Sequence, residues 1–192
     1  GSCDTGVVND IENKAEDKAE NKAEDKAENK AEDKAENKVN TTVGYTDIPD
    51  EDFEQALIDL GYDDLIDGKV LTNNIDTIDS LQISYMGIAD LSGIDAFTDL
   101  TYLDCSENNL TSLDVIKKTA LTVLICHNNN SEGRLKVLDL SGCSALTELY
   151  CPRTYVDSLD VSGCSALTKL NCHWSGLKSL NISGCSSLTH LD

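Results

Sequence analysis

Basic residues are scarce in this 192-residue chain, which has 15 lysines and arginines against 35 acidic residues and a net charge of −20. Residues 47–107 contain 16 acidic residues and a single base, Lys69. Nucleic acids and anionic membrane surfaces attract clusters of Lys and Arg. The composition therefore argues against both as partners. It favours a solubilising role for the acidic surface, with a cation-binding or salt-adapted surface as the alternative.

Long apolar runs and close pairs of metal ligands are also missing. No stretch approaches the ~18 apolar residues of a transmembrane helix, and the eight cysteines contain no CxxC pair of the kind zinc sites use. Residues 63–68 have the acidic start of a calcium loop, but Leu65 occupies a ligand position and Asn74 replaces the bidentate glutamate. A turn at Asp67-Gly68 is preferred, and a weak calcium site is the alternative. No metal or cofactor is predicted.

A sequence block recurs with a period of 21 residues. Leu-Thr-x-Leu-x-Cys begins at Leu100, Leu121, Leu146 and Leu167, and a fifth copy starts at Leu188. The steps are 21, 25, 21 and 21 residues, and about four extra residues in 128–134 explain the long one. The pattern LxxLxCxxNxL at this period predicts a leucine-rich-repeat solenoid over residues 79–192, with 130–134 as a protruding loop.

Each repeat carries two short alternating segments, which predict two parallel strands per rung and little helix, an α/β class that is mostly β in content. Asn108 and Asn129 stand where such repeats satisfy backbone groups at a turn. The repeat cysteines recur at two fixed phases, so side chains on neighbouring rungs point in parallel and suit disulfides poorly. We expect buried, reduced ladders, because cysteine is a good small core residue.

Two segments precede the repeats. Residues 15–45 form a spacer, in which 15–38 are three copies of Ala-Glu-Asp-Lys-Ala-Glu-Asn-Lys; it lacks a core and is either partly helical or a coil. Residues 46–78 form an acidic N-terminal cap. Within it Ile48–Gly61 predicts one helix, with acids near its start and Gly61 at its end. Phe53 and Leu57 share its apolar face, which suits a helix that covers the first rung.

The motif Ile48-Pro-Asp-x-x-Phe53-Glu-Gln-Ala-Leu-Ile-Asp-Leu-Gly61, then Asp67-Gly68 and Val70-Leu-Thr72, leads into the Leu-Thr-x-Leu-x-Cys repeats. Residues 48–192 thereby resemble the cell-surface leucine-rich-repeat proteins of the Bacteroidetes type and, more distantly, bacterial internalins. The resemblance implies an exported chain whose repeats serve recognition or adhesion, with no enzymatic activity attached to the repeats.

Cysteine also stands near the start of the chain, in residues 1–14. Cys3 followed by a polar spacer is similar to the acylated cysteine of a bacterial lipoprotein, and a stray cysteine is the alternative reading. The resemblance implies an outer-membrane lipoprotein at the cell surface, in contact with the membrane only through a lipid anchor at Cys3.

Residues that flank the inward leucine of each first strand must face solvent on the concave side. Aromatic, histidine and arginine side chains gather in these columns and at their rim, and such clusters mark interaction sites. Ordinary cross-strand ladders are the alternative explanation. The predicted ligand-binding residues are Tyr102, Ile125, His127, Tyr150, Arg153, His173, Trp174 and His190.

The first functional hypothesis is a recognition module that binds a protein or a glycan through this concave face. The alternative is a structural accessory lipoprotein of an outer-membrane nutrient-uptake or secretion complex. An enzyme is disfavoured, because the cysteines are expected to be buried and the histidines have no acidic residue in a matching column to orient them. No catalytic residue is predicted.

Overall fold

The computed structural model describes residues 44–116, 118–129 and 135–192. The chain divides into two units, Gly1–Thr42 and Val43–Asp192, and all described residues belong to the second. The expected anchor segment with Cys3, the Ala/Glu/Lys spacer up to residue 43 and the expected loop at 130–134 lie outside the described residues.

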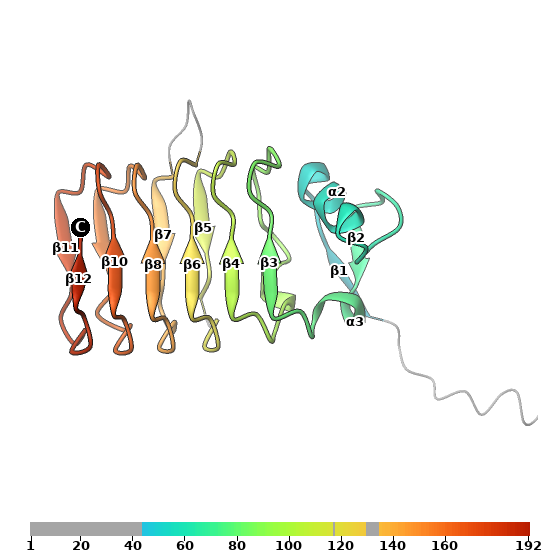
Figure 1. Ribbon diagram of the computed structural model, residues 1–192. Coiled ribbons are helices and arrows are strands. Elements are labelled where there is room, and N and C mark those ends of the chain that lie inside the picture. Colours follow the sequence, from blue (N-terminus) through green and yellow to red (C-terminus); the bar gives the residue numbers. More distant parts are fainter. Residues whose placement is uncertain (1–43, 117, 130–134) are drawn as a thin grey trace, which may run out of the picture. The chain divides into compact units, whose positions relative to one another are not determined.

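Six parallel strands form the main sheet, in the order β3-β4-β6-β8-β10-β12 (Figure 1). Each strand follows the previous one by one repeat, so the chain climbs one strand per turn of the solenoid. The strands are β3 (Ser80–Gln82), β4 (Tyr102–Asp104), β6 (Val123–Ile125), β8 (Glu148–Tyr150), β10 (Lys169–Asn171) and β12 (His190–Leu191). The predicted parallel-strand solenoid is confirmed.

The repeated leucines hold this sheet in register. Leu103 lies opposite Leu124, Leu124 opposite Leu149, and Leu149 opposite Leu170 in adjacent strands. These leucines are buried at 0 or 1% exposure, whereas their neighbours in each strand are partly exposed. Because side chains alternate across a strand, a slip of one residue would put every leucine in water. The 21-residue period therefore fixes the pairing.

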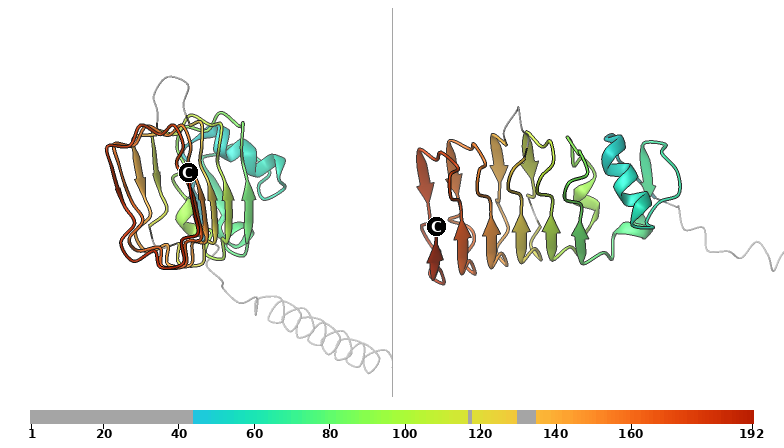
Figure 2. Two further views of the ribbon diagram at one scale, coloured as in Figure 1. Left: turned by 60° about the vertical axis from the view of Figure 1, so that its left-hand side comes forward. Right: turned by 45° about the horizontal axis from the view of Figure 1, so that its top comes forward.

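A second layer runs along the opposite side of the solenoid (Figure 2). It consists of two parallel pairs, β5-β7 and β9-β11. The second strand predicted in each rung is thus present in four repeats, as β5 (Ser112–Asp114), β7 (Val137–Asp139), β9 (Ser158–Asp160) and β11 (Ser179–Asn181). The first rung has a short 3-10 helix, η1 (Ile94–Ala96), at this place instead.

The seven described cysteines are free thiols, as expected from their parallel stacking. Five are buried, and Cys172 and Cys185 in the last turns are half-buried. Cys143 donates from Sγ to the carbonyl of Val115 at 3.4 Å, so its thiol is satisfied inside the core. Burial raises the pKa of Cys143 and of Cys151 to about 12. These cysteines act as small core residues and not as reactive thiolates.

Buried asparagines close two of the turns, as predicted. The Asn108 side-chain oxygen accepts the N–H groups of Met86 and Ile88 at 3.0 and 3.1 Å. Its amide nitrogen donates to the carbonyls of Ile83 and Cys105, at 2.7 and 3.1 Å. Asn129 makes equivalent hydrogen bonds in the next repeat. Backbone groups that the turn leaves unpaired are thus satisfied in the interior.

The segment before the repeats contains two helices and an antiparallel strand pair. β1 (Tyr45–Asp47) pairs with β2 (Lys69–Leu71), and α3 (Thr72–Ile75) follows directly. The predicted helix over 48–61 is present as α2 (Glu51–Asp59). It is shorter because the Asp50 side chain accepts the N–H of Phe53 at 2.9 Å and so caps the helix after Pro49.

Helix α2 packs against the first turns of the solenoid. Phe53 is fully buried and stacks on Phe97, with ring centroids 6.2 Å apart. The second carboxylate oxygen of Asp50 accepts the N–H groups of Ala89 and Asp90 at 2.9 and 2.8 Å. The apolar face of the helix therefore joins the same core as the repeats.

Candidate binding surface

The solvent side of the six-stranded sheet, here the strand face, displays two columns of side chains. One column runs Tyr102, Val123, Glu148, Lys169 and His190, each opposite the next in register. The second runs Gln82, Asp104, Ile125, Tyr150 and Asn171. Neighbouring rungs cover much of each side chain, so Tyr102, Ile125 and Tyr150 are half-buried.

Polar groups on the strand face largely satisfy one another. The Tyr150 hydroxyl donates to one Glu148 oxygen at 2.8 Å, and Lys169 Nζ donates to the other at 2.7 Å. The hydrogen bond from Lys169, then that from Tyr150, lowers the pKa of Glu148. The hydrogen bond to Glu148 raises the pKa of Tyr150. Tyr150 thus belongs to an internal network.

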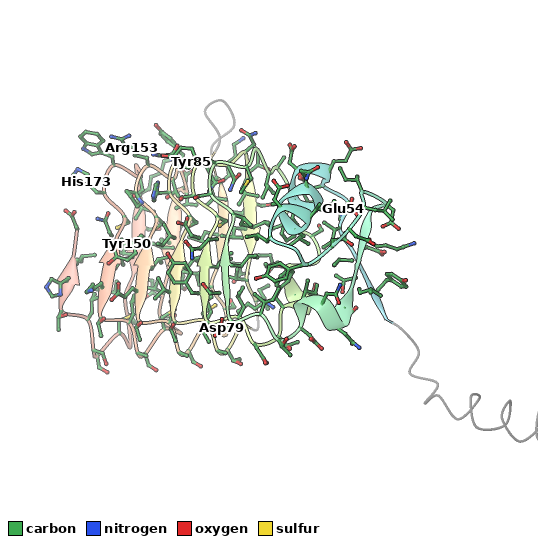
Figure 3. All side chains as sticks on the ribbon, turned by 45° about the vertical axis from the view of Figure 1, so that its right-hand side comes forward. Glu54, Asp79, Tyr85, Tyr150, Arg153 and His173 are labelled. Carbon is green, nitrogen blue, oxygen red and sulfur yellow. The ribbon has the colours of Figure 1, made fainter. Side chains whose placement is uncertain are left out.

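Where each strand ends, the chain turns through a residue in the left-handed region. These positions, here the turn rim, have φ between 50 and 60° and none is glycine. They are Tyr85, Glu107, Asn128, Arg153 and Trp174, one per repeat. An L-residue pays roughly 1–2 kcal/mol for this conformation. Its side chain is directed outward, and the labelled Tyr85, Arg153 and His173 gather along this edge while Tyr150 lies below it (Figure 3).

The N-terminal half of the turn rim is organised around one carboxylate. Glu107 accepts a hydrogen bond from Asn128 and lies 3.9 Å from Nδ1 of His127. The charge of Glu107, with a hydrogen bond between the two side chains, raises the pKa of Tyr85. This half of the rim is therefore anionic and internally paired.

The C-terminal half carries the only tryptophan of the chain. The Trp174 side chain is 67% exposed. The Arg153 guanidinium lies over its ring, 5.0 Å from the centroid, and the His173 ring stacks on it at 5.0 Å with 26° between the planes. The backbone N–H of Arg153 donates to the His173 carbonyl at 2.9 Å, which ties the two turns together. The three side chains form one cluster.

A shallow hollow of about 420 Å³, here the rim hollow, adjoins this cluster. Its size lies within the range of small-ligand sites, ~300–1,000 Å³. Asp192 borders it, held by His173 Nδ1 at 3.7 Å and by Asn171 Nδ2 at 3.4 Å. The residues that line the rim hollow are His127, Asn128, Pro152, Arg153, Asn171, His173, Trp174 and Asp192.

The predicted ligand-binding residues thus fall into two groups. His127, Arg153, His173 and Trp174 come together around the rim hollow. The other four lie on the strand face, spread from Tyr102 on β4 to His190 on β12. Register pairs Ile125 with Tyr150, which fits the cross-strand explanation for these two residues.

The sequence-based selection missed Tyr85, which is 75% exposed on the turn rim. The repeat period could have identified Tyr85, because this residue lies 22 residues before Glu107, which is close to one period. The first rung is irregular in sequence, which hid this alignment.

Two features are absent from the described ranges, a cluster of metal ligands and a long apolar helix. They contain no three or more His, Cys, Asp or Glu side chains placed to hold a metal ion together. No helix in the same ranges has the length and apolar character needed to cross a bilayer.

Comparison with solved structures places the fold among bacterial internalins. The functional domain of InlJ from Listeria monocytogenes, which includes a cysteine ladder, matches with 27% identity and a TM-score of 0.56, over 78% of this chain and 38% of that one. The internalin inlF from the same species matches with 23% identity and a TM-score of 0.54, over 75% of this chain and 43% of that one. The chain thus spans less than half of either structure's length.

No protein with curated function matches the sequence significantly. A family model described as the endo-beta-N-acetylglucosaminidase EndoS LRR domain matches residues 70–192, which is more than half of the chain. With its 21-residue rungs, buried leucine columns and internalin-like fold, the chain belongs to this family of leucine-rich-repeat domains.

Proposed function

We propose that the protein is a recognition module that binds a protein or glycan ligand through the turn rim and the adjoining strand face. The observation that carries the proposal is Trp174, which is 67% exposed and contacts the Arg153 guanidinium and the His173 ring. An indole that is 67% exposed contributes little to the buried core. Trp and Arg are the side chains most enriched among residues that dominate binding energy.

The architecture supports the same role. Stacked repeats present extended surfaces whose variable exposed positions can be changed without disturbing the core. In this chain the leucine and cysteine columns supply the core, and the exposed columns are free to carry binding chemistry. Burial and raised pKa values of the core thiols leave no activated cysteine nucleophile among the described residues.

The proposed location is the cell surface, with the protein held as an outer-membrane lipoprotein through Cys3. Support comes from the sequence around Cys3 and from the polar, coreless composition of residues 15–38. Mass spectrometry of the N-terminal peptide from protein isolated from its native membrane tests this anchor. A diacylglyceryl modification on Cys3 is expected, and an unmodified thiol would contradict the anchor.

Binding through the rim is tested with the full chain on an array of glycans and in pull-downs from solubilised outer membranes. The variant Trp174→Ala should lose at least tenfold in affinity for whatever the wild-type protein retains, because a tryptophan that anchors an interface is worth ~2 kcal/mol or more. Tyr155→Ala is the matched control, since Tyr155 is 43% exposed but lies outside the rim hollow.

Full retention of binding by Trp174→Ala would refute the proposed function. Stoichiometric co-purification of this variant with a membrane barrel would instead favour a structural role in an outer-membrane complex. Both results require that Trp174→Ala remains folded, which its unfolding curve establishes.

A further inference from the structure

The rim hollow contains a guanidinium without an ion-pair partner among the described residues. Within those ranges, lysine ion pairs involve Lys69, Lys169 and Lys178, and Arg153 takes part in none. Its contact is the Trp174 ring, which leaves the N–H donors of the guanidinium edge available. Arginine has five such donors in a planar fork, which fits both oxygens of a carboxylate. Arg153 therefore offers the hollow hydrogen-bond donors that suit an anionic group.

We propose that the rim hollow binds a carboxylate-bearing sugar of the uronic or sialic acid type, with the carboxylate on Arg153 and the sugar ring against Trp174. This inference rests on the proposed function and names its ligand class. The ring of Pro152 adds apolar surface to the hollow beside the indole. Pockets of this kind combine apolar walls with a few placed polar groups, which is what a sugar with one apolar face requires.

A single sugar residue fits this site better than an acidic segment of a protein. The hollow has a volume of only about 420 Å³. A stable protein interface needs roughly 800 Å² on each partner. The adjoining strand face is largely polar, and its Glu148, Tyr150 and Lys169 are already satisfied by one another. Little of the face beyond the hollow is therefore left for a broad apolar contact.

The distribution of charge along the chain also favours an anionic ligand at the hollow. Residues 47–107 carry 16 acidic residues and one base, which would repel a carboxylate. Residues 108–192 hold seven acidic and seven basic residues, so the field is balanced there. Two carboxylates beside the site oppose an anion. Asp192 lies on the border of the hollow, where His173 and Asn171 hold it, and Glu107 accepts a hydrogen bond from Asn128 and lies 3.9 Å from His127. Removal of the Asp192 charge should strengthen binding.

The experiment compares matched acidic and neutral sugars: 3′-sialyllactose with lactose, and a glucuronic acid-terminated disaccharide with its glucose-terminated counterpart. Binding to the full chain is measured by the change in Trp174 fluorescence and checked by calorimetry. At least one acidic probe should bind at least tenfold more tightly than its neutral partner, which corresponds to ~1.4 kcal/mol.

The variant Arg153→Met should abolish this preference, and Arg153→Lys should restore only some of it, because an ammonium group cannot make two parallel hydrogen bonds. Asp192→Asn should bind the acidic probe a few-fold more tightly. Lys178→Met is the matched control, since Lys178 is exposed, pairs with Asp157 and lies outside the hollow.

Equal affinity for acidic and neutral probes, absence of binding to all four probes, or a preference that survives Arg153→Met would overturn the inference. An acidic hexapeptide that binds as tightly as the sugars, and equally needs Arg153, would overturn the assignment to a sugar. Failure of the proposed function gives a different result. If the proposed function is wrong, Trp174→Ala keeps its binding partners. If only the sugar inference is wrong, Trp174→Ala loses its partners, but the wild-type protein shows no preference for acidic sugars.

Discussion

The buried Asn108 allows the turn energetics to be predicted in numbers. Replacement of Asn108 by alanine removes the partners of two fully buried groups, the N–H of Ile88 and the carbonyl of Ile83. The carbonyl of Cys105 loses one donor but keeps the amide of Asn129 at 3.0 Å. A buried polar group without a partner costs about 1–3 kcal/mol. Taking the low end for each of the two groups, Asn108→Ala should lower the free energy of unfolding by about 2 kcal/mol.

Thr154 stands at the equivalent phase and provides an internal comparison. Its hydroxyl makes one bond, to the carbonyl of Cys151 at 2.7 Å, so Thr154→Ala should cost about 1 kcal/mol. Urea unfolding followed by circular dichroism measures both losses. Asn109→Ala is the control, since Asn109 is exposed and its amide donates to the carbonyl of Gly87. The reasoning is refuted if Asn108→Ala costs no more than Thr154→Ala.

Three further predictions concern burial and charge. In the folded protein at pH 8, iodoacetamide should alkylate half-buried Cys172 faster than Cys126, because burial raises the pKa of the Cys126 thiol well above 9.0. Peptide mass spectrometry before and after urea unfolding measures the two alkylation rates. Equal rates would contradict the buried ladder. Glu54→Gln should destabilise the fold by about 2 kcal/mol in urea, because one oxygen of the fully buried carboxylate accepts the N–H groups of residues 67–69 at 2.8–3.0 Å and its charge strengthens these bonds. The amide NH₂ of glutamine would also face the N–H of Gly68, which the second carboxylate oxygen accepts at 3.0 Å; an unchanged midpoint would show that these bonds contribute nothing. The pKa of Glu148 lies below its ordinary 4.5, so its contribution to stability is present above pH 4.5 and is lost as the pH falls through the folded value. Lys169→Met should therefore move the NMR titration midpoint of Glu148 upward, and an unmoved midpoint would exclude Lys169 as the main cause.

The repeat period made much of the fold predictable from sequence. Register follows from the phase of residues such as Leu124 and Leu149, because only one alignment buries every leucine. The turn role of Asn108 follows from the same phase, since the unpaired backbone groups recur with the turn. Periodicity thus carries long-range information that a single sequence normally lacks.

Non-periodic contacts could not be predicted in this way. Glu54 is a charged residue on a helix whose sequence is amphipathic, yet it is 0% exposed because a distant loop supplies its hydrogen-bond donors. Lys118 is 6% exposed because its ammonium group donates to the carbonyls of Asp95 and Phe97, at 3.0 and 2.8 Å. Neither the loop nor the irregular first rung recurs in the sequence, so no repeat pattern predicts these contacts.

The sequence predicts where the residues of the candidate site lie, but it does not predict which of their side chains contact one another. Phase alone placed Arg153 and Trp174 at the turn that follows each strand. Whether these side chains meet each other or neighbours on the strand face depends on the left-handed turn, with φ of 55° at both residues. The same sequence columns gave no sign that Tyr150 would bond to Glu148 and so leave the site.

The central claim is that Trp174 stands in solvent beside the Arg153 cation. As the only tryptophan, it can be quenched with iodide and with caesium to report the local charge. In a protein of net charge −20, the overall field favours caesium, yet the account predicts efficient iodide quenching that falls in Arg153→Met and not in Lys178→Met. Protection of Trp174 from both ions, or iodide quenching that Arg153→Met leaves unchanged, would contradict it.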